Sequence, residues 1–145
     1  MQNTVHFILQ GKGGIGKTLV STILAQWLAS KSAAGDMAIS IGGALLVAAL
    51  RQVRAGDPRY AGIAVQAMPC LFACQDHCTI HLRAPGRVGY VLGRFTPDED
   101  AARAILDYAV HYADSEHGRV AYAAWPEGVK GHFIVRTPPA GYVAE

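Results

Sequence analysis

Residues 69–92 read PCLFACQDHCTIHLRAPGRVGYVL, and this stretch organises the rest of the chain. It opens with a loop over 69–79, called here the cysteine loop. This loop holds all three cysteines of the protein, spaced four residues apart, and one histidine beside them: Cys70, Cys74, His77 and Cys78. Beyond it, apolar and polar residues alternate over 79–83, which predicts a strand. A turn containing Pro-Gly and a second apolar run at 88–92 complete a predicted β-hairpin.

The cysteine loop concentrates soft ligands for a metal. Thiolates and imidazoles at this density are what a zinc ion or an iron–sulfur cluster uses, so the candidate ligands are Cys70, Cys74, Cys78 and His77. Two other interpretations stay open. The cysteines can pack as small apolar side chains. Alternatively, Cys70 and Cys74 can form a redox disulfide, although thiol oxidoreductases prefer the shorter Cys-x-x-Cys spacing.

The first 32 residues carry a different motif. A predicted strand at 4–10 leads into GKGGIGKT at 11–18, and a predicted helix follows to residue 30. This order matches G-x-x-x-x-G-K-[ST], in which backbone N–H groups surround phosphates, the second lysine reaches the outer phosphates and the hydroxyl holds Mg²⁺. The motif predicts a site for Mg-ATP made by Gly11, Lys12, Gly13, Gly14, Ile15, Gly16, Lys17 and Thr18.

With its additional lysine at Lys12, the segment 1–32 resembles the start of ParA/MinD-type ATPases, and most of all the TraL-like conjugal-transfer proteins of plasmids. In that family the matching lysine contacts phosphate across a nucleotide-sandwich dimer. The resemblance implies ATP binding in plasmid partition or conjugal transfer. The chain lacks the acidic motifs with which such ATPases hold Mg²⁺ and orient water, so we expect little or no hydrolysis.

The remaining elements indicate a small α/β domain. In chain order they are a small-residue linker at 32–40, a helix at 43–54, a strand at 63–67, a helix from an N-cap at Thr96 to about Tyr112, and a tail strand at 132–135. Few strands and one hairpin favour a small mixed sheet with packed helices over the repeated strand–helix units of a nucleotide-binding sheet. We expect one domain over residues 1–145.

Four collinear segments, at 69–74, 78–86, 89–93 and 125–134, carry a second resemblance. From about residue 43 to 141 the chain resembles a family of small bacterial proteins of unknown function, described as predicted metal-binding and similar to thioredoxin-like ferredoxins. This implies a thioredoxin-like fold and a metal or iron–sulfur centre for electron transfer or sensing. The family carries a further Cys-x-x-Cys pair after its first strand, where this chain has the glycine-rich loop. Cys70 and Cys74 therefore match one half of a ferredoxin-like site.

The chain is thus composite, with a phosphate-loop unit at 1–32 and a thioredoxin-like, metal-binding body at 40–145. Within one chain, Cys78 with His77 or His81 could complete a ligand set; otherwise two chains would share a metal as a homodimer. The first hypothesis is a small metal- or iron–sulfur-binding protein with a redox partner. An ATP-binding protein and a thiol oxidoreductase are the alternatives.

The composition limits the class of protein and the kinds of partner that we expect. Hydrophobic residues make up 51% of the 145 residues and charged residues 17%, which is typical of a globular domain. The net charge of +2 and the scattered arginines mark no track for nucleic acid. We see no secretory signal and no apolar run long enough for a membrane span, so we expect a cytoplasmic protein.

Overall fold

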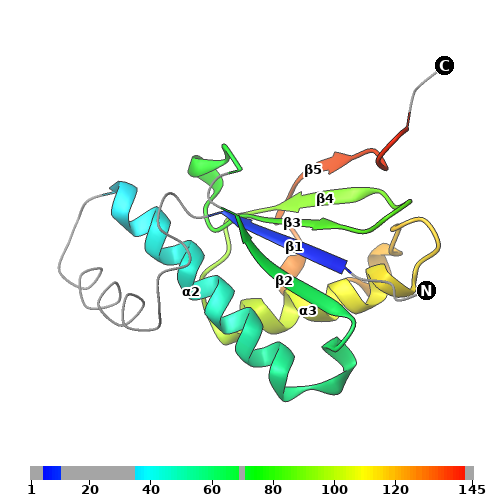
Figure 1. The fold of residues 1–145 in the computed structure, drawn as a ribbon, viewed down its shortest axis with the longest axis horizontal. Helices are drawn as coiled ribbons and strands as arrows, with labels where there is room; N and C mark the ends of the chain where they lie inside the picture. Colours follow the sequence, from blue (N-terminus) through cyan, green and yellow to red (C-terminus); the bar gives the residue numbers. More distant parts are fainter. Residues whose placement is uncertain (1–4, 11–34, 69–70, 143–145) are drawn as a thin grey trace.

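The computed structural model describes residues 5–10, 35–68 and 71–142. Its centre is a five-stranded sheet in the order β2-β1-β3-β4-β5. The strands are β1 (Val5–Gln10), β2 (Ile63–Met68), β3 (Ile80–Arg83), β4 (Gly89–Leu92) and β5 (Phe133–Thr137). β1 and β2 run parallel, whereas every other neighbouring pair is antiparallel (Figure 1). The expected small mixed sheet is therefore confirmed, and the predicted hairpin forms β3 and β4.

Two long helices pack side by side on one face of this sheet. They are α2 (Gly35–Gly56) and α3 (Glu99–Asp114), and they contact each other as well as the strands (Figure 1). Short 3₁₀ turns connect the elements: η1 (Pro58–Tyr60), η2 (Cys74–Asp76), η3 (Tyr122–Ala124) and η4 (Glu127–Val129). Among the described helices, none has the length and apolar character needed to cross a bilayer.

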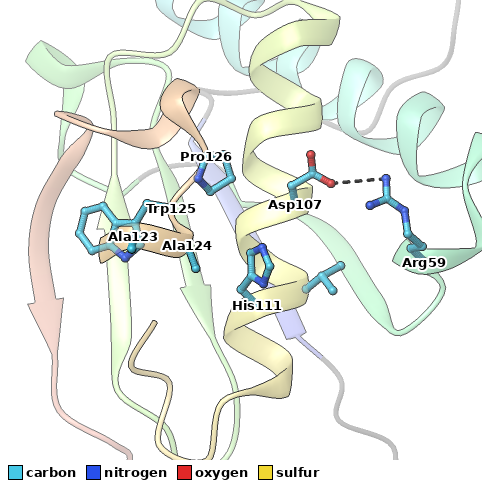
Figure 2. A pocket seen from close by; sticks show the side chains of 8 residues that line it. Arg59, Asp107, His111, Ala123, Ala124, Trp125 and Pro126 are labelled. Atoms are coloured by element: carbon cyan, nitrogen blue, oxygen red, sulfur yellow. Dashed lines mark ion pairs between the residues drawn. The ribbon is translucent and has the colours of Figure 1, made fainter. Parts of the chain in front are cut away.

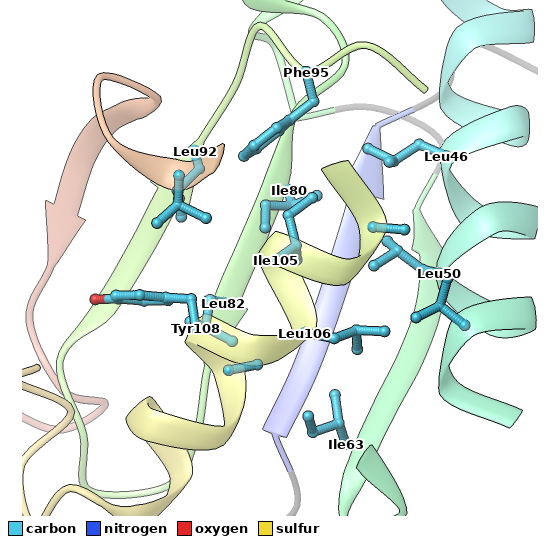
Figure 3. Packing of buried hydrophobic residues seen from close by; sticks show 14 of the residues in the cluster. Leu46, Leu50, Ile63, Ile80, Leu82, Leu92, Phe95, Ile105, Leu106 and Tyr108 are labelled. Atoms are coloured by element: carbon cyan, nitrogen blue, oxygen red, sulfur yellow. The ribbon is translucent and has the colours of Figure 1, made fainter. Parts of the chain in front are cut away.

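The core lies between the sheet and the two helices, where the apolar stripes of all three meet. On β3, Ile80 and Leu82 are buried while His81 and Arg83 are directed to the other face, as the alternation predicts. Figure 3 shows the buried side chains converging from strands and helices, among them Leu46, Leu50, Leu92, Ile105, Leu106 and Tyr108. Full burial of such a side chain stabilises a fold by about 1.5–3 kcal/mol. Each helix therefore directs one apolar face toward the sheet.

The linker predicted at 32–40 is wrong from residue 35 onward, because α2 begins at Gly35. The small residues there were interpreted as a break, but helix formation continues through Gly42 in the middle of α2. A Cβ at this position would lie 2.9 Å from the Sγ of Cys78, which is closer than real Cβ contacts. Glycine therefore serves close packing against the cysteine loop at this point.

The start of α3 also differs from the prediction. The N-cap is Asp98 rather than Thr96, and its carboxylate accepts a hydrogen bond from the backbone N–H of Ala101 at 2.8 Å. Pro97 thus precedes the cap instead of occupying the first helical position. An aspartate cap also places negative charge at the positive end of the helix, which favours it over threonine.

Candidate metal centre

The cysteine loop leaves the sheet at the edge where the parallel strands end. Gln10 and Met68 are register partners at the ends of β1 and β2. From this edge the chain passes through the loop to the start of β3 (Figure 1). In α/β sheets, ligands bind in the crevice outside the carboxyl ends of parallel strands. The fold therefore puts the cysteine loop at the sheet edge best suited to a site.

Hydrogen bonds fix the described part of the loop to the chain that follows β4. The buried hydroxyl of Thr79 donates to the backbone carbonyl of Asp76 at 2.9 Å. The backbone N–H of Arg94 donates to the same carbonyl at 2.7 Å. Cys78 and Phe95 exchange two backbone hydrogen bonds of 3.4 Å. These hydrogen bonds hold the described part of the loop against the segment that follows β4.

The thiol of Cys78 is directed into the core. Cys78 is 2% exposed, and its Sγ faces Gly42 of α2. Burial raises the pKa of this thiol to about 11. Metals bind the thiolate, so an apolar site that keeps the proton on sulfur disfavours ligation. In this arrangement Cys78 packs as a small apolar side chain, which was one of the alternatives for the cysteines.

Cys74 and His77 lie on the outer side of the loop. Cys74 begins η2 and is partly exposed, and His77 follows η2 and is exposed. The Nδ1 of His77 lies 3.1 Å from the backbone carbonyl of Cys74. A carbonyl only accepts, so Nδ1 carries the proton and the neutral ring keeps a lone pair on Nε2. That tautomer is the one in which an imidazole ligates a metal through Nε2.

The described members of the predicted ligand set do not converge. Across residues 5–10, 35–68 and 71–142, no three His, Cys, Asp or Glu side chains form a group that could hold a metal ion. Cys74 and His77 stay at the surface, whereas Cys78 enters the core as β3 begins. Cys70 lies outside the described residues, as does the whole predicted nucleotide site at 11–18.

Phe72 is a feature of the loop that the sequence did not mark. Its side chain is 96% exposed. Its backbone φ of +56° lies in the left-handed region, which is uncommon for a bulky residue. Hydrophobicity alone would place a phenylalanine in the core. Only the backbone conformation of the folded loop shows that Phe72 is held outward.

A hollow lies beside α3, between η1 and η3. It has a volume of about 400 Å³ and is lined by Arg59, Asp107, His111 and the Trp125–Pro126 turn, among others (Figure 2). The carboxylate of Asp107 accepts a hydrogen bond from the Tyr60 hydroxyl at 2.7 Å. Burial, together with Asp107, raises the pKa of Tyr60 to about 12. These contacts join η1 to α3.

The overall fold is similar to that of a solved structure described as a thioredoxin-like [2Fe–2S] ferredoxin from Aquifex aeolicus. The likeness covers 97% of this chain and 99% of that chain, with a TM-score of 0.55 and 13% sequence identity. At this identity the likeness concerns the fold, which is therefore thioredoxin-like. No curated protein gave a match.

A family model described as "Protein of unknown function (DUF1636)" matches residues 27–139. The chain belongs to this family. The match includes the cysteine loop and the Trp125–Pro126 turn, both of which carried the second resemblance. It begins after the glycine-rich motif at 11–18, and neither comparison supports the resemblance of the first 32 residues to ParA/MinD-type ATPases.

The donors of this family member fit an iron–sulfur cluster in part. A [2Fe–2S] cluster takes four ligands, mostly thiolates. The sequence contains three cysteines, and the thiol of Cys78 is packed against α2. Among the described residues, the thiol of Cys74 and the imidazole of His77 are the remaining donors of the loop, and Cys70 lies outside the part of the chain that the structure describes. The described donors therefore supply only part of the ligand set that such a cluster needs.

Proposed function

We propose that this protein is a small iron–sulfur- or metal-binding protein that transfers electrons to a redox partner. The observation that supports it most is the place of the cysteine loop. The loop occupies the carboxyl edge of the parallel strand pair, in a fold like that of a protein described as a [2Fe–2S] ferredoxin. Cys74 lies on the solvent side of this loop.

Each residue of the loop has a role in this proposal. Cys70 and Cys74 are the thiol ligands, and His77 offers Nε2 as a further donor. Thr79 holds the loop backbone, since its hydroxyl satisfies the Asp76 carbonyl. Cys78 is a packing residue that joins the loop to α2. When bound, an iron–sulfur cluster would supply a one-electron carrier at the surface of the protein.

Metal analysis of protein purified without oxygen tests the proposal. We expect stoichiometric iron with acid-labile sulfide and visible absorption, or stoichiometric zinc in a colourless protein. Cys74→Ser should remove the metal, whereas the matched variant Cys78→Ser should keep it. A wild-type protein without stoichiometric metal contradicts the proposal. Insulin reduction that depends on Cys70 and Cys74 in such a metal-free protein would favour the thiol oxidoreductase instead.

A second function, the binding of Mg-ATP, rests on one local observation. β1 ends at Gln10, directly before the glycine-rich motif at 11–18, as a phosphate-binding loop requires. Against it, β1 has an antiparallel neighbour in β3, which differs from the parallel sheet of ParA-type ATPases. Calorimetry with Mg-ATP on the wild type and on Lys17→Ala tests whether the motif at 11–18 binds the nucleotide. Binding that Lys17→Ala abolishes supports it, and identical behaviour of the two proteins rejects it.

A further inference from the structure

We propose that Arg94 is a positioning residue for the cysteine loop: its guanidinium holds the turn between Cys74 and His77 in place before a metal binds. The inference rests on the proposed function, in which these two residues are donors. It adds a residue that acts on their geometry through Asp76 rather than by ligating the metal. Three observations support it: the hydrogen bonds of Asp76, the contacts of the Arg94 side chain, and the backbone around Arg94.

Asp76 lies between the two described donors and fixes the turn that carries them. It ends η2, which begins at Cys74, and its backbone N–H donates to the carbonyl of Ala73 at 3.0 Å across this turn. The carbonyl of Asp76 accepts a hydrogen bond from the backbone N–H of Arg94 at 2.7 Å. A displacement of Asp76 would therefore change the geometry between Cys74 and His77, which lie on either side of it in the chain.

The side chain of Arg94 makes two further contacts with one guanidinium group. Its Nε is 3.6 Å from a carboxylate oxygen of Asp76, and its second terminal nitrogen donates to the backbone carbonyl of Gly131 at 2.9 Å. The same two segments are joined next to it, because the backbone N–H of Gly93 donates to the carbonyl of His132 at 2.9 Å. Arg94 therefore ties the cysteine loop to the segment before β5, with the fixed fork of donors that a guanidinium provides.

The backbone at residues 93 and 94 is shaped by this close approach. A Cβ on Gly93 would lie 2.5 Å from the carbonyl oxygen of Asp76, so the loop reaches this place only beside a glycine. The φ of Arg94 is +65°, in the left-handed region that costs energy for a residue with a side chain. Strain of this kind persists only where the surrounding structure imposes it, and such positions cluster at functional sites. The arginine thus has a conformational cost that glycine would not have.

The test compares wild type with two variants of Arg94, as anaerobic full-length proteins with Co²⁺ as the probe metal. Arg94→Gly removes the guanidinium and keeps the backbone N–H that donates to Asp76, and glycine adopts the left-handed conformation without strain. Arg94→Lys keeps a positive charge but replaces the planar fork with a single ammonium group. Arg119→Gly, at an exposed arginine between α3 and η3, is the matched control.

We expect Arg94→Gly to weaken Co²⁺ binding about tenfold, as is typical when a group that orients metal ligands is removed, and to change the visible absorption bands of the bound Co²⁺. In metal-free protein, the thiol of Cys74 should react about three times faster with iodoacetamide, because the turn opens more often without the ion pair. Fragment-ion mass spectrometry measures that rate at Cys74. Arg94→Lys should resemble Arg94→Gly, and Arg119→Gly should resemble wild type.

The stability of the metal-free protein separates positioning from a merely structural role. The Arg94 side chain is 54% exposed, so its ion pair contributes little to overall stability, and glycine relieves the left-handed strain. The urea midpoint of Arg94→Gly should therefore equal or exceed that of wild type although its Co²⁺ affinity falls. A lower urea midpoint together with an unchanged Co²⁺ affinity and spectrum overturns the inference.

The remaining outcomes distinguish this inference from the proposed function. The alkylation rates are measured without metal, and equal rates in wild type and Arg94→Gly overturn the role of Arg94 while leaving the proposed function standing. Wild-type affinity and alkylation rate in Arg94→Lys would show that charge alone suffices, which also overturns positioning by the fork. A wild-type protein that holds no stoichiometric metal of any kind overturns the proposed function, and the metal role of Arg94 with it.

Discussion

On the helix-covered face of the sheet, Leu50 and Leu82 are completely buried, whereas Phe72 on the cysteine loop is 96% exposed. The core side chains interlock between two helices and the strands (Figure 3). Hydrogen bonds also fix the described part of the loop, yet the side chain of Phe72 is exposed to solvent. Apolar burial explains the first region. Apolar burial does not explain the second region, where the loop holds Phe72 in solvent.

Truncation in the core should give the largest effect. Leu82→Ala removes a fully buried side chain from β3 and leaves a cavity. We expect a loss of about 2–5 kcal/mol in the free energy of unfolding, measured by urea denaturation of the metal-free protein. A loss below about 1 kcal/mol would mean that this face is not the main core.

The next effect concerns Cys78, which lies where the two regions meet. Its pKa is raised by burial from 9.0 to about 11, so between these values the folded state binds more protons than the unfolded chain. Stability contributed by the neutral thiol is therefore complete below pH 9 and is lost as pH rises toward 11, with a total on the order of 2 kcal/mol. The measurement is urea denaturation of metal-free protein from pH 8 to 11. Cys78→Ala should show a flatter decline, and equal slopes would place the thiol in solvent.

A smaller effect joins the loop to α2. Gly42→Ala puts a Cβ 2.9 Å from the Cys78 Sγ, so crowding should outweigh the better helix propensity of alanine and destabilise the protein by about 1 kcal/mol. In the Cys78→Ala background the sulfur is absent, and Gly42→Ala should then be stabilising by a few tenths of a kcal/mol or more. Additive effects in this double-mutant cycle would show that positions 42 and 78 do not interact.

The smallest effect is expected at Phe72 itself. Phe72→Ala in the metal-free monomer should change the unfolding free energy by less than about 0.5 kcal/mol, because the ring is exposed. The difference in unfolding free energy between Phe72→Ala and Leu82→Ala therefore compares the two regions most directly. A loss of several kcal/mol at Phe72 would show that the ring packs against the folded protein.

The sequence was a good guide where hydrophobic periodicity is strong. The alternation of apolar and polar residues over 79–83 predicted which face of β3 is buried, because the pattern matches the two-residue period of a strand. Element starts were less predictable. At Thr96, Pro97 and Asp98 several signals compete, and the hydrogen bond from Ala101 to Asp98 decides among them only in the folded chain.

The candidate site shows the limit of spacing as a guide. Four-residue intervals between the cysteines suggested that Cys74 and Cys78 act together, but direction depends on the backbone. Cys74 begins a 3₁₀ turn at the surface, and Cys78 lies two residues before β3, where its side chain enters the core. The thioredoxin-like fold agreed with the second resemblance. The metal ligands and the nucleotide site at 11–18 remain predictions.

The pairing of Gln10 with Met68 has a consequence for how proteins of this plan can change. Gln10 therefore lies one strand spacing, about 4.8 Å, from Met68, and a segment grafted after Gln10 would begin at that distance from the end of β2. Exchanging that single segment would add or remove half of a four-sulfur cage and leave the scaffold intact. A variant with Cys-x-x-Cys grafted directly after Gln10 would then have a four-thiol ligand set within one chain.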